Sequence, residues 1–157
     1  MKARALLLPL VLLVALGGCA TKYDTEGWTG GYSEKQVSDT DWVVTFAGNG
    51  FTTRETVQTF WLYRAAELTL SHGYAGFQVA SNVKLVSASP GFVPVQYAQK
   101  PYIVGRIHML KGPIKANPPF VFDAAVLAKT LEAYVKGPMC DQNVCPHAHI
   151  YLMPPLT

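Results

Sequence analysis

The sequence predicts a single two-layer α+β domain in which a mixed β-sheet carries two helices on one face. Two segments have the apolar spacing of amphipathic helices, and short β-branched and aromatic runs lie around them. The expected order is strand, helix, strands, helix and short strand, which favours helices packed on one side of a sheet. Half of the 157 residues are hydrophobic, which excludes a disordered chain and suffices for one core.

The first strand and the first helix have the clearest signals. Trp42–Phe46 is β-branched and aromatic, and Gly48–Gly50 supplies a turn after it. Thr52 lies three residues before Glu55, the spacing of a capping box, so a helix is expected over residues 53–72. The aromatic side chains expected in the core are Trp42, Phe46, Phe60, Trp61 and Tyr63.

The second half of the chain predicts more strands and one more helix. Asp123 is a good N-cap, and Leu127 and Leu131 lie on one face of the segment that follows, so a helix is expected at Ala124–Lys136. Strands are expected at residues 77–86, 92–98, 102–110 and 150–153.

The N-terminus has the pattern of a secretory signal. Lys2 and Arg4 precede the apolar run Ala5–Leu16, which is too short to span a bilayer, since roughly 20 apolar residues are needed. The stretch Leu16-Gly17-Gly18-Cys19 at the end of this run resembles the lipobox of bacterial lipoproteins. That resemblance implies that residues 1–18 are a signal peptide and that Cys19 is lipidated. An ordinary cleaved signal with a chance cysteine is the alternative.

We expect the protein to be attached to a membrane through the lipid on Cys19. The residue after Cys19 is Ala20 and not Asp, which in similar lipoproteins favours the periplasmic leaflet of the outer membrane over the inner membrane. Removing Lys2 and Arg4 lowers the formal net charge from +3 to +1. With no cluster of basic residues left, nucleic acid is excluded as a partner.

The domain boundaries follow from these patterns. Residues 19–39 are expected to be the lipidated N-terminus and a tether, and residues 40–157 the globular domain. A flexible tether of this length reaches about 25 Å. Trp28 and Gly30-Gly31-Tyr32 are unusual for a linker and suggest docking onto the domain.

A C-terminal group of cysteines and histidines is the sharpest chemical pattern. Cys140, Cys145, His147 and His149 fall within ten residues, and such ligands suit zinc or copper. With Cys19 taken by lipid, however, two thiols remain in an oxidising compartment, which favours a Cys140–Cys145 disulfide. The metal site stays open as the alternative, and no cofactor is otherwise expected.

Two charged residues lie three apart in an apolar part of the first helix. Arg64 and Glu67 could bind a polar ligand, but charges near a core are normally paired. We therefore expect a structural ion pair, with each other or with other partners.

A resemblance covers about residues 28–85. It is carried by Gly30-Gly31-Tyr32-Ser33-Glu34, Gly48-Asn49-Gly50-x-Thr52, Leu62–Leu70 and Gly73-Tyr74-x-x-Phe77. These motifs resemble an uncharacterised family of small proteobacterial lipoproteins, best represented in alphaproteobacteria. The resemblance implies an envelope location and a related fold, and it implies no catalytic residues.

The functional expectation follows from what is present and absent. Neither Gly-x-Ser-x-Gly nor His-Glu-x-x-His occurs, so catalysis is not indicated, although a catalytic set dispersed along the sequence would escape this search. We expect a membrane-anchored, non-catalytic envelope lipoprotein that binds a protein partner or the cell wall. A zinc- or copper-binding lipoprotein is the alternative.

Overall fold

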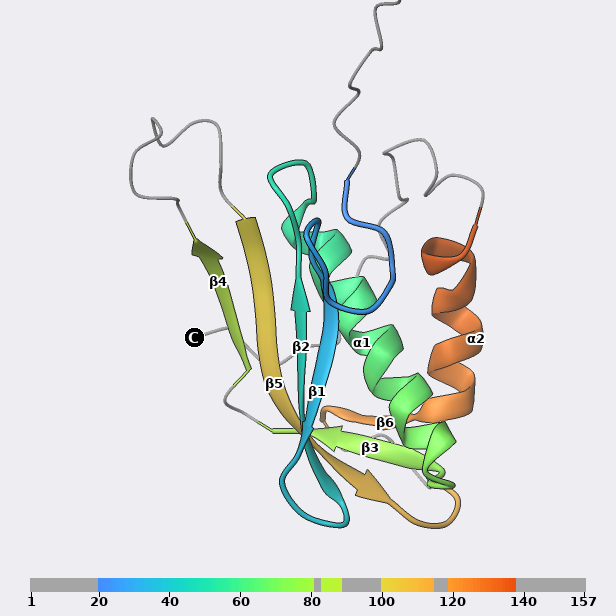
Figure 1. Cartoon of the computed structure of the whole chain (residues 1–157). Helices are drawn as coiled ribbons and strands as arrows, with labels where there is room; N and C mark the ends of the chain where they lie inside the picture. The colour runs from blue at the N-terminus through green and yellow to red at the C-terminus, as the bar shows by residue number, and fades with distance from the viewer. Residues whose placement is uncertain (1–19, 81–82, 89–99, 115–118, 138–157) are drawn as a thin grey trace, which may run out of the picture.

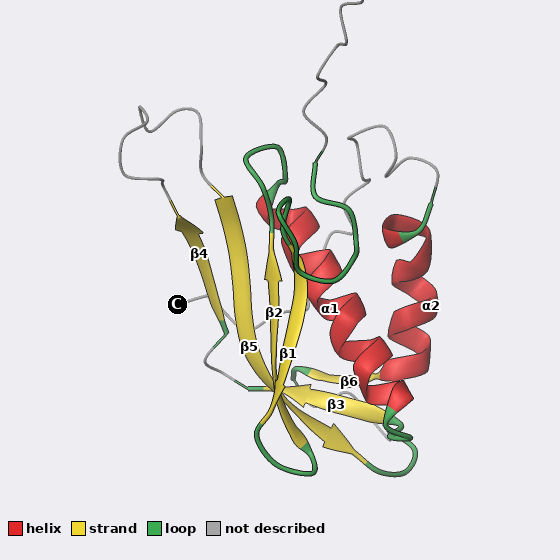
Figure 2. Cartoon of the chain, viewed as in Figure 1, coloured by secondary structure: helices red, strands yellow, loops and turns green. Residues whose placement is uncertain are grey.

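The fold is a six-stranded sheet with two helices on one side of it (Figures 1 and 2). The computed structural model describes residues 20–80, 83–88, 100–114 and 119–137. The strands are β1 (Gly31–Gln36), β2 (Asp41–Ala47), β3 (Gly76–Val79), β4 (Lys84–Ala88), β5 (Lys100–Leu110) and β6 (Val121–Asp123). The helices are α1 (Arg54–Ser71) and α2 (Ala124–Val135). The predicted α+β class, with both helices on one face, is confirmed.

The long strand β5 organises the sheet. One edge of β5 pairs with β2, and its other edge pairs with β4 near the start and β3 near the end. β1 lies outside β2 and β6 outside β3, and all five pairings are antiparallel. The 11 residues of β5 are enough for two strands to share one edge.

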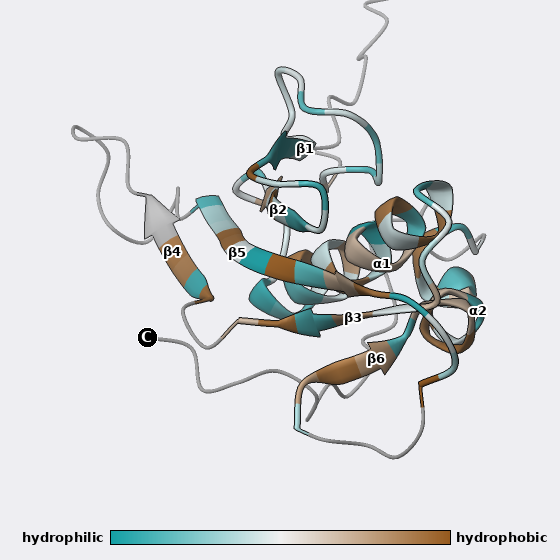
Figure 3. Ribbon diagram, turned by 90° about the horizontal axis from the view of Figure 1, so that it is seen from below, coloured by the Kyte–Doolittle hydropathy of each residue, from teal (hydrophilic) through white to brown (hydrophobic). Residues whose placement is uncertain are grey.

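Alternation along β5 separates a buried face from an open one. Ile103, Gly105, Ile107 and Met109 are buried on the face that meets the helices, whereas Val104, Arg106 and His108 point to the opposite face. Figure 3 shows this alternation of hydrophilic and hydrophobic residues along the strand. Because the apolar residues of β5 are buried on one face against the helices, its pairing register is strongly specified.

Helix α1 is the centre of the core. It contacts β2, β5 and β3, and α2 packs mainly against α1. Its buried side chains include Val57, Phe60, Trp61, Leu62, Tyr63, Ala65, Ala66 and Leu68. Of the aromatic residues expected in the core, Phe46, Phe60, Trp61 and Tyr63 are buried, whereas Trp42 is half-buried.

The N-cap of α1 differs from the expected one. Thr53, not Thr52, is the cap, and its side chain accepts a hydrogen bond from the Thr56 amide. The expected capping box was therefore one residue out of register. Thr52 instead accepts hydrogen bonds from the amides of Thr21 and Asn49, at 2.9 and 3.2 Å.

Trp61 and Gly105 form the tightest contact between α1 and the sheet. The Trp61 side chain is completely buried, and its Nε1 donates to the Val44 carbonyl at 2.8 Å. A Cβ atom at Gly105 would lie 2.7 Å from the indole and 2.9 Å from Val83. Glycine is therefore required at the centre of β5, where the indole lies directly on the backbone.

The strand expected over residues 77–86 is wrong as a single element. β3 ends at Val79 and β4 begins at Lys84, and the two pair with different parts of β5. Phe77, Val79, Val83 and Leu85 keep the same two-residue alternation on both sides of Ser81-Asn82, so the apolar pattern did not reveal the break. The three-residue strand β6 was missed because it is shorter than a recognisable alternating run. Helix α2 begins as expected, with the Val126 amide donating to Asp123 Oδ1 at 3.0 Å.

The tether expected over residues 20–39 is also wrong for most of its length. Residues 31–36 form β1, which pairs with β2 in a six-residue ladder. The preceding residues are held by Thr21, whose Oγ1 accepts from the Asn49 amide at 2.8 Å and donates to the Thr29 carbonyl. β1 was missed because only one of its inward residues, Tyr32, packs against the apolar core, whereas the next, Glu34, is charged and pairs with Arg64. The strands expected at 92–98 and 150–153 lie outside the described residues.

Candidate functional site

The structure brings the predicted pair Arg64 and Glu67 together and gives both further partners. Arg64 Nη1 lies 3.3 Å from Glu67 Oε2. Arg64 Nε donates to Glu34 on β1, and the guanidinium carbon lies 4.1 Å above the centre of the Tyr32 ring. The arginine thus ties α1 to the first strand through an ion pair and a cation–π contact.

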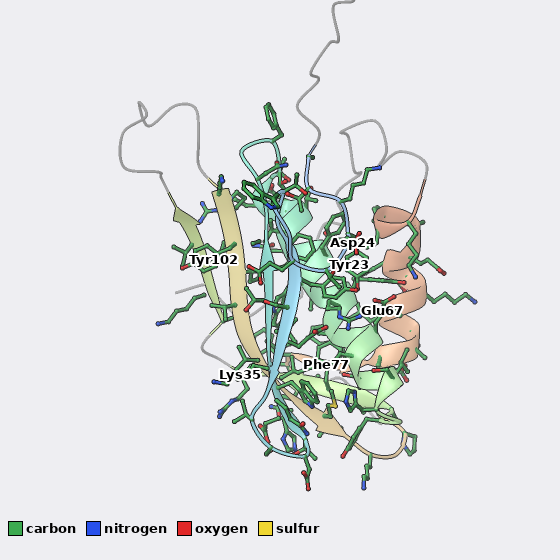
Figure 4. All side chains as sticks on the ribbon, in the orientation of Figure 1. Tyr23, Asp24, Lys35, Glu67, Phe77 and Tyr102 are labelled. Atoms are coloured by element: carbon green, nitrogen blue, oxygen red, sulfur yellow. The ribbon has the colours of Figure 1, made fainter. Side chains whose placement is uncertain are left out.

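Glu67 connects two more segments. Its Oε2 accepts a hydrogen bond from the Tyr23 hydroxyl, and its Oε1 lies 3.2 Å from Lys136 Nζ after α2. Figure 4 shows Tyr23 and Glu67 beside each other where the N-terminal segment crosses α1. The Tyr23 ring also packs edge-on against Phe60 and Tyr63. We call Tyr23, Glu34, Arg64, Glu67 and Lys136 the clamp.

The electrostatics of the clamp favour charged, fully paired groups. Burial opposes the charge on Glu67, but hydrogen bonds from Tyr23 and Lys136 outweigh it and hold the pKa of Glu67 below its ordinary value. Burial would likewise lower the pKa of Arg64, but Glu34 raises it above the usual value. Burial, followed by the hydrogen bond to Glu67, raises the pKa of Tyr23.

These pairings identify the clamp as structural. The side chains of Arg64, Glu34 and Glu67 are only 20, 19 and 25 % exposed, and each is already bonded to another residue of the same chain. A bound ligand would have to displace one of these partners. The clamp therefore joins α1, β1, the N-terminal segment and the end of α2, as expected for charges near a core.

The side of the sheet opposite the two helices is the better candidate for binding. Residues directly opposite one another on neighbouring strands share a face. One such row joins Lys35, Val43 and Arg106, and the next joins Ser33, Thr45, Val104 and Lys84. A third row joins Gly31, Ala47, Tyr102 and Val86. We call these three rows the open face, and no described helix lies over it. Its Gly31 end is buried beside the backbone of Asp24 and Thr25.

Three cations on the open face have no acidic partner in the described parts of the chain. Lys35, Lys84 and Arg106 are exposed, and none of them belongs to the ion pairs found there. The nearest acid in the register, Asp41, lies 3.3 Å from His108 and accepts from Ser38 at 2.7 Å. That bond from Ser38 is the main reason why the pKa of Asp41 is lowered.

The residues of the open face that lie between these cations are partly apolar. Val43, Val104 and Tyr102 are half-buried, as is Thr45 between them. In Figure 4, Tyr102 lies on β5 and Lys35 on β1, two of the four strands that carry the open face. A surface that combines half-buried apolar side chains with exposed charged ones has the composition of a protein-binding patch.

The open face was not recognised from the sequence. Lys35 fell in the expected tether, and Arg106 in a strand whose partners were unknown. The alternation Tyr102, Val104, Arg106 was the available signal, because it placed these residues on one face of a predicted strand. The sequence could not show that β1 and β4 bring two lysines to the same face.

The other predicted sites lie outside the described residues. These are Cys19, the proposed disulfide of Cys140 and Cys145, and the alternative metal ligands that add His147 and His149. Over residues 20–80, 83–88, 100–114 and 119–137, no three His, Cys, Asp or Glu side chains lie close enough to hold a metal ion.

Comparison with known proteins adds no relative. No family model, curated protein or solved structure matches the chain. The resemblance to small proteobacterial lipoproteins therefore remains a prediction. In the described part of the chain, neither helix has the length and apolar character to cross a bilayer.

Proposed function

We propose that this protein is a lipid-anchored, non-catalytic module of the cell envelope that binds an acidic protein surface through its open face. The anchor is a lipid on Cys19, in the periplasmic leaflet of the outer membrane. The observation that carries the binding role is the set of exposed cations Lys35, Lys84 and Arg106, which have no acidic partner among the described residues and surround half-buried side chains.

The position of the anchor favours a partner close to the membrane. Thr21 is hydrogen-bonded to the domain, so only two peptide units separate it from Cys19. An extended chain of that length spans at most about 7 Å. The domain would then stay near the bilayer surface, which argues for a membrane protein as partner and against the more distant cell wall.

Photo-crosslinking in intact cells tests the binding role. A benzoylphenylalanine at Tyr102, on the open face, is expected to give a discrete crosslinked protein band. The charge reversal Lys35→Glu/Arg106→Glu should reduce that band at least about tenfold, because like charges across an interface cost several kcal/mol. The measurement is the yield of the crosslinked product on denaturing gels.

Two matched controls make the result specific. Arg54→Glu/Lys129→Glu changes the net charge by the same amount at exposed positions away from the open face and should leave the band intact. Benzoylphenylalanine at Tyr134, a half-buried tyrosine of α2, should not give the product. Equal yields from positions 102 and 134, or an unchanged band in the charge-reversed variant, would contradict the proposal.

Intact mass of protein extracted from membranes tests the anchor. We expect a chain that begins at residue 19 and carries a diacylglyceryl group, whereas Cys19→Ser should remain unprocessed. The same spectra report on the C-terminal cysteines, because a Cys140–Cys145 disulfide makes the chain about 2 Da lighter than its reduced form. Free thiols with a stoichiometric zinc or copper adduct would instead support the metal alternative.

A further inference from the structure

Two aromatic side chains are exposed on loops that are both held by Thr21. Trp28 is fully exposed and Phe51 is 66 % exposed, and no other aromatic residue is among the exposed large hydrophobic residues of the described segments. Burying large aromatic rings such as these against a matching surface is energetically favourable. Their shared position needs an explanation that the open face does not provide.

Thr21 joins these two loops directly. Its amide donates to Thr52 Oγ1 at 2.9 Å, one residue after Phe51, and its hydroxyl donates to the carbonyl of Thr29, one residue after Trp28. The two aromatic residues thus belong to one small region around Thr21. In Figure 1, the start of the described N-terminal segment (blue) and the loop between β2 and α1 lie at the same end of the sheet, opposite the β1–β2 hairpin.

Both loops are rigidly built. Gly27 and Gly30 exchange backbone hydrogen bonds of 3.0 and 3.1 Å, so Trp28 stands at the tip of a tight turn. Gly30 has a φ of +100°, and a Cβ there would lie 2.2 Å from the Ala47 carbonyl oxygen. In the second loop, the Phe51 amide donates to Asn49 Oδ1 at 2.9 Å. The backbone that carries both rings is therefore already held by hydrogen bonds before any binding.

We propose that Trp28 and Phe51 insert into the lipid interface beside the anchor and form a second, non-covalent membrane contact. This inference rests on the proposed lipidation of Cys19. Because at most about 7 Å of chain separates Cys19 from Thr21, the region around Thr21 must lie at the bilayer surface. Tryptophan is enriched at such interfaces, where its ring is partly in lipid and its N–H remains near the headgroups.

The contact is aromatic and not electrostatic. The charged residues near the two loops have both signs: Lys22 and Arg54 are accompanied by Asp24, Glu26 and Glu55. Attraction to anionic lipid is therefore not expected. The insertion should be the same on zwitterionic and anionic vesicles and should not weaken at high salt.

Depth-dependent fluorescence quenching tests the inference. The full-length lipidated protein is reconstituted into phosphatidylcholine vesicles that contain lipids brominated at shallow or deep acyl positions. The Trp28 signal is the difference between the wild type and Trp28→Phe, which removes the contributions of Trp42 and Trp61. We expect at least twofold quenching of this signal by shallow bromines, weaker quenching by deep ones, and a blue-shifted emission.

Two reporter variants complete the design. Phe51→Trp in the Trp28→Phe background should be quenched in the same way. Val37→Trp in that background places the reporter on the exposed β1–β2 hairpin and should not be quenched. If intact mass shows the lipid but Trp28 is unquenched, the inference is overturned and the anchor stands. If the mass shows no lipid at Cys19, the anchor proposal fails, and this inference fails with it.

Discussion

Replacing Trp61 with alanine is expected to lower the free energy of unfolding by about 4 kcal/mol, the largest effect of any single change proposed for this domain. The side chain is completely buried between α1 and the sheet, so its removal leaves a cavity on the backbone of Gly105. It also removes the 2.8 Å hydrogen bond to the Val44 carbonyl. Urea unfolding followed by circular dichroism measures the loss.

A double-mutant cycle tests whether Gly105 is glycine because of that indole. Gly105→Ala alone should cost about 2 kcal/mol, since the added methyl group overlaps Trp61 and Val83. In the Trp61→Ala background the same methyl group enters the vacated space, so the coupling between the two changes should be at least about 1 kcal/mol. Additive losses would show that the contact does not require glycine.

Glu67→Gln is expected to destabilise the domain by about 2–3 kcal/mol. The carboxylate accepts from Tyr23 and pairs with Arg64 and Lys136, and a neutral amide satisfies these partners poorly. The value lies below the full cost of breaking a buried pair because the side chain is 25 % exposed. Glu132→Gln, an exposed glutamate of α2, is the matched control and should change stability by less than about 0.5 kcal/mol.

The same carboxylate gives stability a defined pH dependence. The pKa of Glu67 is lower in the folded protein than its ordinary value of 4.5, so the folded state binds its proton less readily than the unfolded state. Its contribution is therefore complete above that ordinary value and is lost as the pH falls through the lowered folded-state pKa. In Glu67→Gln, the loss of stability below pH 4.5 should be shallower than in the wild type. Equal acid slopes would contradict the role of the clamp.

The elements that could be predicted were those whose sequence pattern lies within a single continuous segment. Helix α2 and strands β2 and β5 follow from capping and from apolar spacing, which require no knowledge of the partner. β1 could not be predicted in this way, because its inward residues Tyr32 and Glu34 face Arg64. Their pairing becomes visible only when a strand and a helix about 30 residues apart in sequence are placed together.

The same limit applies to the functional residues. Arg64 and Glu67 could be paired from their spacing on a helix, but Tyr23 and Lys136 come from segments 44 and 69 residues away from Glu67. The cations of the open face come from three different strands, and only the register brings Lys35 and Arg106 to either side of Val43. Each of these residues is visible in the sequence, but the strand register that brings them together cannot be read from one sequence.

The short link between Cys19 and Thr21 would also change how the protein meets its partner. An anchored module with a partner in the same membrane searches in two dimensions, and its effective concentration is set by confinement to the bilayer. A modest affinity measured in solution would then suffice for stable pairing at the surface. The solvent-exposed cations of the open face, which contribute little individually in water, suit such a weak and readily reversible association.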